Sequence, residues 1–132
     1  MSEGGEAPAK TLSILVVDDH EVVRQGLSAM LDRRPGFQVV AEAGTVAEAL
    51  DAARRFRPDL VVMDVRLSGE RDGIDLAIEL HRDHAIRCLF ATAHVDAQAR
   101  RRAEAARPLG WLQKPYTMAS LVRMVRRALD LN

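Results

Sequence analysis

Leu12-Ser13-Ile14-Leu15-Val16-Val17-Asp18-Asp19 is the stretch that decides the fold, because an apolar run ends there in two adjacent carboxylates. A second apolar run, residues 60–63, ends at Asp64, and a third, residues 110–113, ends at Lys114. The first two runs are short, rich in β-branched residues and separated by helical patterns, which predicts parallel strands. In an open α/β sheet the carboxyl ends of such strands face one crevice. We therefore expect the four charged side chains to meet.

Strand and helix patterns alternate along the whole chain. Strands are predicted at residues 12–17, 37–41, 60–63, 87–92 and 110–113. Helices are predicted at residues 21–34, 45–56, 74–83, 96–106 and from 117 onward. Thr45 and Glu48 have the spacing of a capping box, and Thr117 is the expected cap of the last helix. The buried face of that helix is predicted to comprise Leu121, Val122, Val125 and Leu129. Strict alternation implies the α/β class: a single doubly wound, five-stranded parallel sheet with five helices.

Bulk composition limits the domain count and the class of partner. The chain has 132 residues and a formal net charge of zero, with no dominant block of like charge, so we expect no nucleic-acid partner. No apolar stretch approaches the ~20 residues that span a bilayer, and no signal pattern opens the chain, so we expect no membrane partner and a cytoplasmic location. Residues 1–9 are typical of a disordered N-terminal lead. One domain is expected over residues 10–132, with no output domain.

The clustered carboxylates predict a cation site. Three acidic groups held together repel one another unless a hard cation joins them. Mg²⁺ is the natural candidate, because it takes one or two carboxylates, keeps several waters and accepts a phosphate oxygen. For Asp18 and Asp19 the alternative is a helix N-cap with a neighbour facing the helix dipole, and one residue can serve both purposes. The histidines show no ligand spacing and are expected at the surface.

Four short motifs stand in order at the ends of the predicted strands. They are Val16-Val17-Asp18-Asp19, Val62-Met63-Asp64, Ala91-Thr92-Ala93 and Lys114-Pro115-Tyr116. In order and spacing they resemble the receiver domain of two-component response regulators, from about residue 11 to the C-terminus. The resemblance implies the (βα)5, flavodoxin-like or CheY-like fold of a stand-alone regulator. It also implies that Asp64 accepts a phosphoryl group, that Lys114 contacts the phosphoryl oxygens, and that the peptide bond after Lys114 is cis.

The same resemblance assigns roles to the neighbours of Asp64. Asp19 and Asp64 are implied to contact Mg²⁺ directly, Asp18 to act through water or by shaping the site, and the backbone carbonyl of Arg66 to complete the protein ligands. Thr92 is implied to be the switch residue that moves toward the site on phosphorylation. Its alternative is a threonine whose hydroxyl is satisfied by strand backbone.

Three further side chains are candidates for modulating the site. Trp111 stands where the family usually has a tyrosine or phenylalanine that swings inward; the alternative is a half-exposed ring that anchors a partner. Arg66 and His94 lie two residues past Asp64 and Thr92, where family side chains overhang the phosphoryl group. We hypothesise that Arg66 shields the aspartyl phosphate from water, the alternative being a solvated arginine.

The loop after Asp64 departs from the family pattern. Ser68 and Gly69 stand where a proline is common, and the loop up to residues 72–73 looks one residue longer. A phosphohydrolase using a phosphoaspartate would need a second aspartate as general acid at the position of Arg66, which argues against turnover and for a phosphoacceptor that is not an enzyme.

We therefore expect a single-domain response regulator that takes a phosphoryl group from a sensor histidine kinase or a histidine phosphotransfer protein. Its output would be a phosphorylation-switched protein–protein contact or passage along a phosphorelay, in a monomer or weak homodimer. The alternative is a phosphorylation-independent interaction module with a relic acidic site. Arg100, Arg101 and Arg102 are expected to be solvated, because consecutive residues point ~100° apart around a helix. Arg123, Arg126 and Arg127 share a helix face, either an ordinary exposed one or a partner surface.

Overall fold

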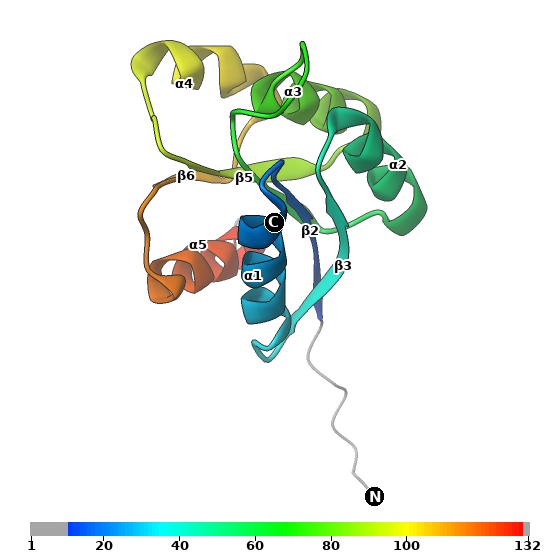
Figure 1. Cartoon of the computed structure of the whole chain (residues 1–132), viewed down its shortest axis with the longest axis vertical. Coiled ribbons are helices and arrows are strands. Elements are labelled where there is room, and N and C mark those ends of the chain that lie inside the picture. The colour runs from blue at the N-terminus through cyan, green and yellow to red at the C-terminus, as the bar shows by residue number, and fades with distance from the viewer. Residues whose placement is uncertain (1–10, 131–132) are drawn as a thin grey trace, which may run out of the picture.

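The computed structural model describes residues 11–130, in which five strands and five α-helices alternate (Figure 1). The strands are β2 (Leu12–Val17), β3 (Phe37–Ala43), β4 (Leu60–Met63), β5 (Arg87–Thr92) and β6 (Gly110–Gln113). The helices are α1 (Glu21–Asp32), α2 (Val46–Phe56), α3 (Gly73–His84), α4 (Ala97–Ala103) and α5 (Met118–Asp130), with a 3₁₀ turn, η1 (Glu104–Ala106), after α4. The predicted lead over residues 1–9 and the side chain of Leu129 lie outside the described part of the chain.

The strands form one parallel sheet in the order β3-β2-β4-β5-β6. The strand order reverses at β2, which has β3 on one side and β4 on the other. A doubly wound sheet opens its binding crevice beside the carboxyl ends of the strands at such a reversal. The predicted fold class is confirmed, and the residues that end β2 and β4 lie at the reversal.

Helices cover both faces of the sheet, which explains why the strands are apolar on both sides (Figure 1). Successive residues of each strand alternate between two buried clusters: Val17, for example, packs toward α2, α3 and α4, whereas Val16 packs toward α1 and α5. Cys88 lies fully buried in the first cluster, and burial raises the pKa of its thiol far above the ordinary range. No helix among residues 11–130 is both long enough and apolar enough to cross a bilayer.

Two predicted boundaries and one capping box need correction, whereas the two threonine caps are confirmed. Strand β3 runs two residues beyond 41, and the helix predicted over 96–106 divides into α4 and η1. Thr45 caps α2 by accepting a hydrogen bond from the Glu48 amide at 3.1 Å. The reciprocal bond of the predicted capping box is absent, because the Glu48 carboxylate accepts from the amide of Gly44 instead. Thr117 caps α5 through its hydroxyl, which accepts from the Ser120 amide at 3.0 Å.

Candidate functional site

The charged residues predicted to meet do meet, because ladder hydrogen bonds carry each of them to the same edge of the sheet. The Asp18 amide donates to the carbonyl of Ala43 at 3.1 Å, and the Asp64 amide donates to the carbonyl of Val17 at 3.3 Å. The amide of Lys114 donates to the carbonyl of Thr92 at 2.8 Å, extending the β5–β6 pairing by one residue. Backbone pairing thus fixes where these side chains start.

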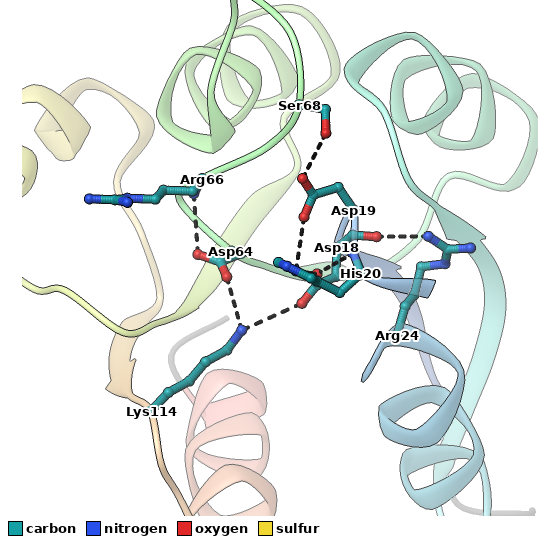
Figure 2. Close-up of polar contacts among 8 residues, drawn as sticks. All are labelled: Asp18, Asp19, His20, Arg24, Asp64, Arg66, Ser68 and Lys114. Carbon is teal, nitrogen blue, oxygen red and sulfur yellow. Dashed lines mark hydrogen bonds and ion pairs between the residues drawn. The ribbon is translucent and has the colours of Figure 1, made fainter. Parts of the chain in front are cut away.

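Lys114 joins two of the carboxylates. Its ammonium nitrogen lies 2.9 Å from Asp64 Oδ2 and 3.5 Å from Asp18 Oδ2 (Figure 2). Burial lowers the pKa of Lys114, but the hydrogen bond and charge of Asp64, aided by Asp18, outweigh that effect and raise the pKa above its ordinary value. The Lys114–Pro115 peptide bond is cis, as the resemblance implied. Lys114 is therefore a fixed positive charge between two aspartates.

Asp18 is almost fully buried, with 3% of its surface exposed. Its Oδ1 accepts a hydrogen bond from the His20 amide at 2.8 Å, and its backbone carbonyl accepts from Arg24 Nη1 at 2.8 Å (Figure 2). The helix N-cap is His20, which makes no capping bond with its side chain, so neither Asp18 nor Asp19 is the N-cap of α1. The alternative of a capping role for this pair is wrong.

Asp19 has one satisfied and one unsatisfied oxygen. Its Oδ2 accepts a hydrogen bond from Ser68 Oγ at 2.8 Å. Its Oδ1 is buried and accepts no hydrogen bond from the described residues, although His20 Nδ1 lies 3.1 Å away. A buried oxygen without a donor is costly, and a cation relieves that cost. The feature fits the bound Mg²⁺ that the sequence predicts.

Ligand atoms of Asp18, Asp19 and His20 lie within 4.8 Å of one another and could hold a metal ion. Two carboxylates form the hard-oxygen donor set that suits Mg²⁺. Asp64 is outside this group: its carboxylate contacts Lys114 and accepts a hydrogen bond from the Arg66 amide at 3.2 Å (Figure 2). Metal contacts by Asp64 and by the Arg66 carbonyl therefore stay predictions.

Thr92 ends β5 one strand away from Asp64 and is 2% exposed. Its hydroxyl oxygen lies 3.5 Å from the amide of His94, a long hydrogen bond. Such a weak backbone partner leaves the hydroxyl available for another acceptor. The predicted role of Thr92 as a switch is compatible with this geometry and stays a prediction.

Trp111 lies half-buried on β6, paired with Phe90 of β5 across the sheet. The two rings stack with centroids 4.5 Å apart and an interplanar angle of 25°. The guanidinium of Arg100, from α4, lies over the Trp111 ring, 5.4 Å from its centroid. Trp111 thus links α4 to the core of the sheet, and Arg100, which is exposed as predicted, also contacts this ring.

Arg66 and His94 both have exposed side chains. Figure 2 shows the Arg66 side chain directed away from Asp64, with only its backbone amide reaching the carboxylate. In this arrangement Arg66 does not cover the carboxylate, so the shielding hypothesis requires the side chain to turn inward once a phosphoryl group is present.

Three contributors to the site were missed by sequence reasoning. His20 and Ser68 contact the acidic pair, and Gly73 packs against the backbone of Asp64. His20 directly follows the acidic pair, which is a usable local signal. Ser68 carries no such signal, because its partner Asp19 lies 49 residues earlier in the chain.

A protein-family model described as the response regulator receiver domain matches residues 14–126. The chain belongs to this family. Receiver domains are phosphoacceptor signalling modules of two-component systems, and they partner with histidine kinases. The acidic pair at the end of β2 is consistent with a Mg²⁺ site in such a domain.

Relatives of the chain are regulators of longer sequence. It is 40% identical over 116 residues to the DNA-binding transcriptional activator DevR/DosR of Mycobacterium tuberculosis, covering 87% of this chain and 53% of that protein. It is 34% identical over 117 residues to the transcriptional regulatory protein PdtaR of the same species, covering 89% and 56%. The chain thus spans about half the length of these curated relatives.

Solved structures agree on the fold. A two-component response regulator of the LuxR family from Aurantimonas sp. SI85-9A1 superposes with a TM-score of 0.83 at 37% identity, covering 92% of this chain and 86% of that one. The response regulator domain of Thermotoga maritima CheB gives the same TM-score at 22% identity, covering 93% and 99%, which shows the fold alone.

Proposed function

We propose that Asp64 is the phosphoacceptor of this receiver and that a histidine kinase or a histidine phosphotransfer protein supplies the phosphoryl group. The observation that carries the proposal is the position of Lys114, whose ammonium lies 2.9 Å from Asp64 Oδ2 and bridges to Asp18. A fixed cation beside a carboxylate nucleophile is suited to hold the oxygens of an incoming phosphoryl group.

In the proposed reaction a carboxylate oxygen of Asp64 attacks the phosphorus of a phosphohistidine. The new oxygen–phosphorus bond forms as the phosphorus–nitrogen bond breaks, and the electron pair returns to the imidazole, which takes up a proton. Lys114 shifts from the Asp64 carboxylate to a phosphoryl oxygen, and the hydroxyl of Thr92 donates to another. The charge that arrives with the phosphoryl group thereby meets preorganised donors.

Asp18 and Asp19 would hold Mg²⁺, with Asp64 completing the acidic set, and such an ion would supply positive charge to the phosphoryl oxygens. The acidic pair offers carboxylate oxygens that are shielded from solvent: Asp18 is 3% exposed, and Asp19 Oδ1 is buried and accepts no hydrogen bond from residues 11–130. Electrostatic interactions are stronger in such a site than in water.

The output proposed for residues 11–130 is a changed protein-binding surface or passage of the phosphoryl group to another histidine. Trp111 supports a surface change, because it connects the buried Phe90 to α4 at the exterior. A cytoplasmic location and a monomer or weak homodimer are parts of the same proposal.

The proposal is tested by incubating the protein with acetyl phosphate and Mg²⁺ and following its intact mass. We expect one phosphoryl group per chain, abolished by Asp64→Asn and by EDTA. Asp51→Asn, a change of the same chemistry on the exposed face of α2, is the matched control and is expected to be phosphorylated normally. A phosphorylation-linked change in Trp111 fluorescence would show that the signal reaches β6.

Uptake by Asp64→Asn equal to the wild type would contradict the assignment. Absence of uptake by a folded, Mg²⁺-binding wild type, repeated with a phosphorylated histidine kinase, would favour the phosphorylation-independent interaction module instead.

A further inference from the structure

Helix α4 is tied to the start of α3 by a single arginine. Arg102 donates through Nη1 to Asp72 Oδ2 at 2.9 Å and through Nη2 to Asp72 Oδ1 at 3.3 Å, and the same Nη2 lies 3.3 Å from Asp75 Oδ1. A two-pronged arginine contact shared by two carboxylates is stronger than an ordinary surface ion pair. Arg102 is exposed, as its spacing predicted, but it is also a specific connector between α4 and α3.

The two carboxylates that Arg102 contacts also cap α3. The Asp72 carboxylate accepts from the Asp75 amide, and the Asp75 carboxylate accepts from the Asp72 amide, each at 3.0 Å. This reciprocal capping box closes the loop of residues 65–72 that follows Asp64. Burial raises the pKa of the Asp72 carboxyl, but the bonds and charge of Arg102 and the Asp75 amide outweigh it, so the pKa falls below its usual value.

The loop so closed contacts the acidic site at several points. The Arg66 amide donates to the Asp64 carboxylate, and the Ser68 hydroxyl donates to the Asp19 carboxylate. Gly73, next to Asp72, donates its amide to the Val65 carbonyl at 2.6 Å. A displacement of the capping box therefore changes the geometry around both aspartates.

Apolar contacts hold α4 only weakly against its neighbours. The residues of α4 and η1 that pack into the core beside α3 are alanines: Ala99, Ala103 and Ala106. An alanine buries a single methyl group, which contributes much less than a leucine or phenylalanine at the same position. Arg102 therefore supplies a directional polar contact between α4 and the start of α3 that these small apolar contacts do not provide.

We propose that Arg102 is a positioning residue that ties α4 to the loop following the phosphoacceptor, so that a change of this loop on phosphorylation is passed directly to α4. This inference rests on the proposed function of Asp64. It adds a second route to α4, through α3, beside the one that Trp111 of β6 and Arg100 provide on the same face of the sheet.

Three variants isolate the contact. Arg102→Gln removes the guanidinium. Asp72→Asn removes the charge while keeping an oxygen that caps a helix equally well. Arg101→Gln is the matched control, because it makes the same change of charge at the next residue of α4, which is exposed and has no ion-pair partner within residues 11–130. Circular dichroism confirms that each variant is folded.

The measurement is hydrogen exchange, read by mass spectrometry on peptides covering residues 66–72 and 97–106. In the unphosphorylated protein we expect Arg102→Gln and Asp72→Asn each to speed exchange in both segments by about twofold to fivefold, the range for a networked surface pair. A protein carrying both Arg102→Gln and Asp72→Asn should exchange little faster than the more affected single variant, because both changes remove the same contact. Arg101→Gln should match the wild type. Unchanged exchange of residues 66–72 in Arg102→Gln would overturn the proposed connection between α4 and this loop.

The change in hydrogen exchange on phosphorylation distinguishes a positioning role of Arg102 from a merely structural one. We expect acetyl phosphate and Mg²⁺ to alter exchange over residues 97–106 in the wild type, and the alteration to shrink by half or more in Arg102→Gln. An arginine that only stabilises α4 would shift both states equally and leave the phosphorylation-dependent difference intact, which would overturn the proposal. Intact mass on the same samples separates the two claims: a wild type that gains no phosphoryl group contradicts the role of Asp64, while the unphosphorylated comparison still decides the tie.

Discussion

Gly73→Ala should destabilise the protein through a clash with the backbone of Asp64. A β-carbon at position 73 would lie 2.1 Å from the Asp64 carbonyl oxygen and 3.1 Å from its carbonyl carbon. Both are backbone atoms at the end of β4, so the chain itself must shift. Inserting a methyl group into such a space costs about 3 kcal/mol, the upper part of the range for overpacking.

Two effects oppose that cost. Replacing glycine by alanine restricts the unfolded chain, which stabilises the fold by ~0.4–1 kcal/mol where no strain arises. Helix propensity also favours alanine, although the first residue of α3 gains less than an interior one. The net loss of unfolding free energy is about 2 kcal/mol, which lowers Tm by roughly 6–10 °C in a domain of this size.

Gly26→Ala is the matched control, because a β-carbon there meets nothing within 4 Å in the middle of α1. We expect this variant to gain about 0.5–1 kcal/mol in unfolding free energy. Thermal and urea unfolding, followed by circular dichroism, measure both variants. A Gly73→Ala protein as stable as wild type, beside a stabilised Gly26→Ala, would refute the argument that Gly73 is required by its closeness to Asp64.

Three other expectations follow from the site and the core. The folded-state pKa of Lys114 is raised above its usual value of 10.5, so the stabilisation that its charged form provides is complete below pH 10.5 and is lost as the pH rises through the raised pKa. The unfolding free energies of wild type and Lys114→Met, measured in urea, should therefore converge in strong alkali. Mg²⁺ at ten times its dissociation constant should raise the unfolding free energy by about 1.4 kcal/mol, and Asp19→Asn should abolish most of this gain in calorimetry. The buried Cys88 thiol, with its raised pKa, should resist iodoacetamide at pH 8 until denaturant unfolds the chain; rapid labelling of the folded protein would contradict its burial.

Local patterns were sufficient to predict the sheet and the meeting of the charged residues. Strands such as Leu60–Met63 are apolar on both faces, and turn or helix signals separate them, so their positions along the chain and their parallel direction could be predicted. Asp64 and Lys114 come together because each follows a parallel strand, which is a rule of the fold and not of any one side chain.

The polar contacts at the start of α3 could not be predicted in this way. The capping box of α3 pairs two aspartates, whereas the usual signature has glutamate or glutamine at the second position. Arg102 lies 30 residues from Asp72, and nothing local distinguishes it from Arg101. The contact between Arg102 and Asp72 depends on how α4 docks on α3, which only the folded arrangement determines.

The most direct test of the central claim is to locate the phosphoryl group on the chain. After phosphorylation with acetyl phosphate and Mg²⁺, borohydride reduces an aspartyl phosphate to homoserine, which peptide mass spectrometry detects. We expect a single conversion, at Asp64, with none in a sample treated with EDTA. Conversion at another carboxylate, such as Asp18 or Asp19, with Asp64 unmodified, would contradict the account.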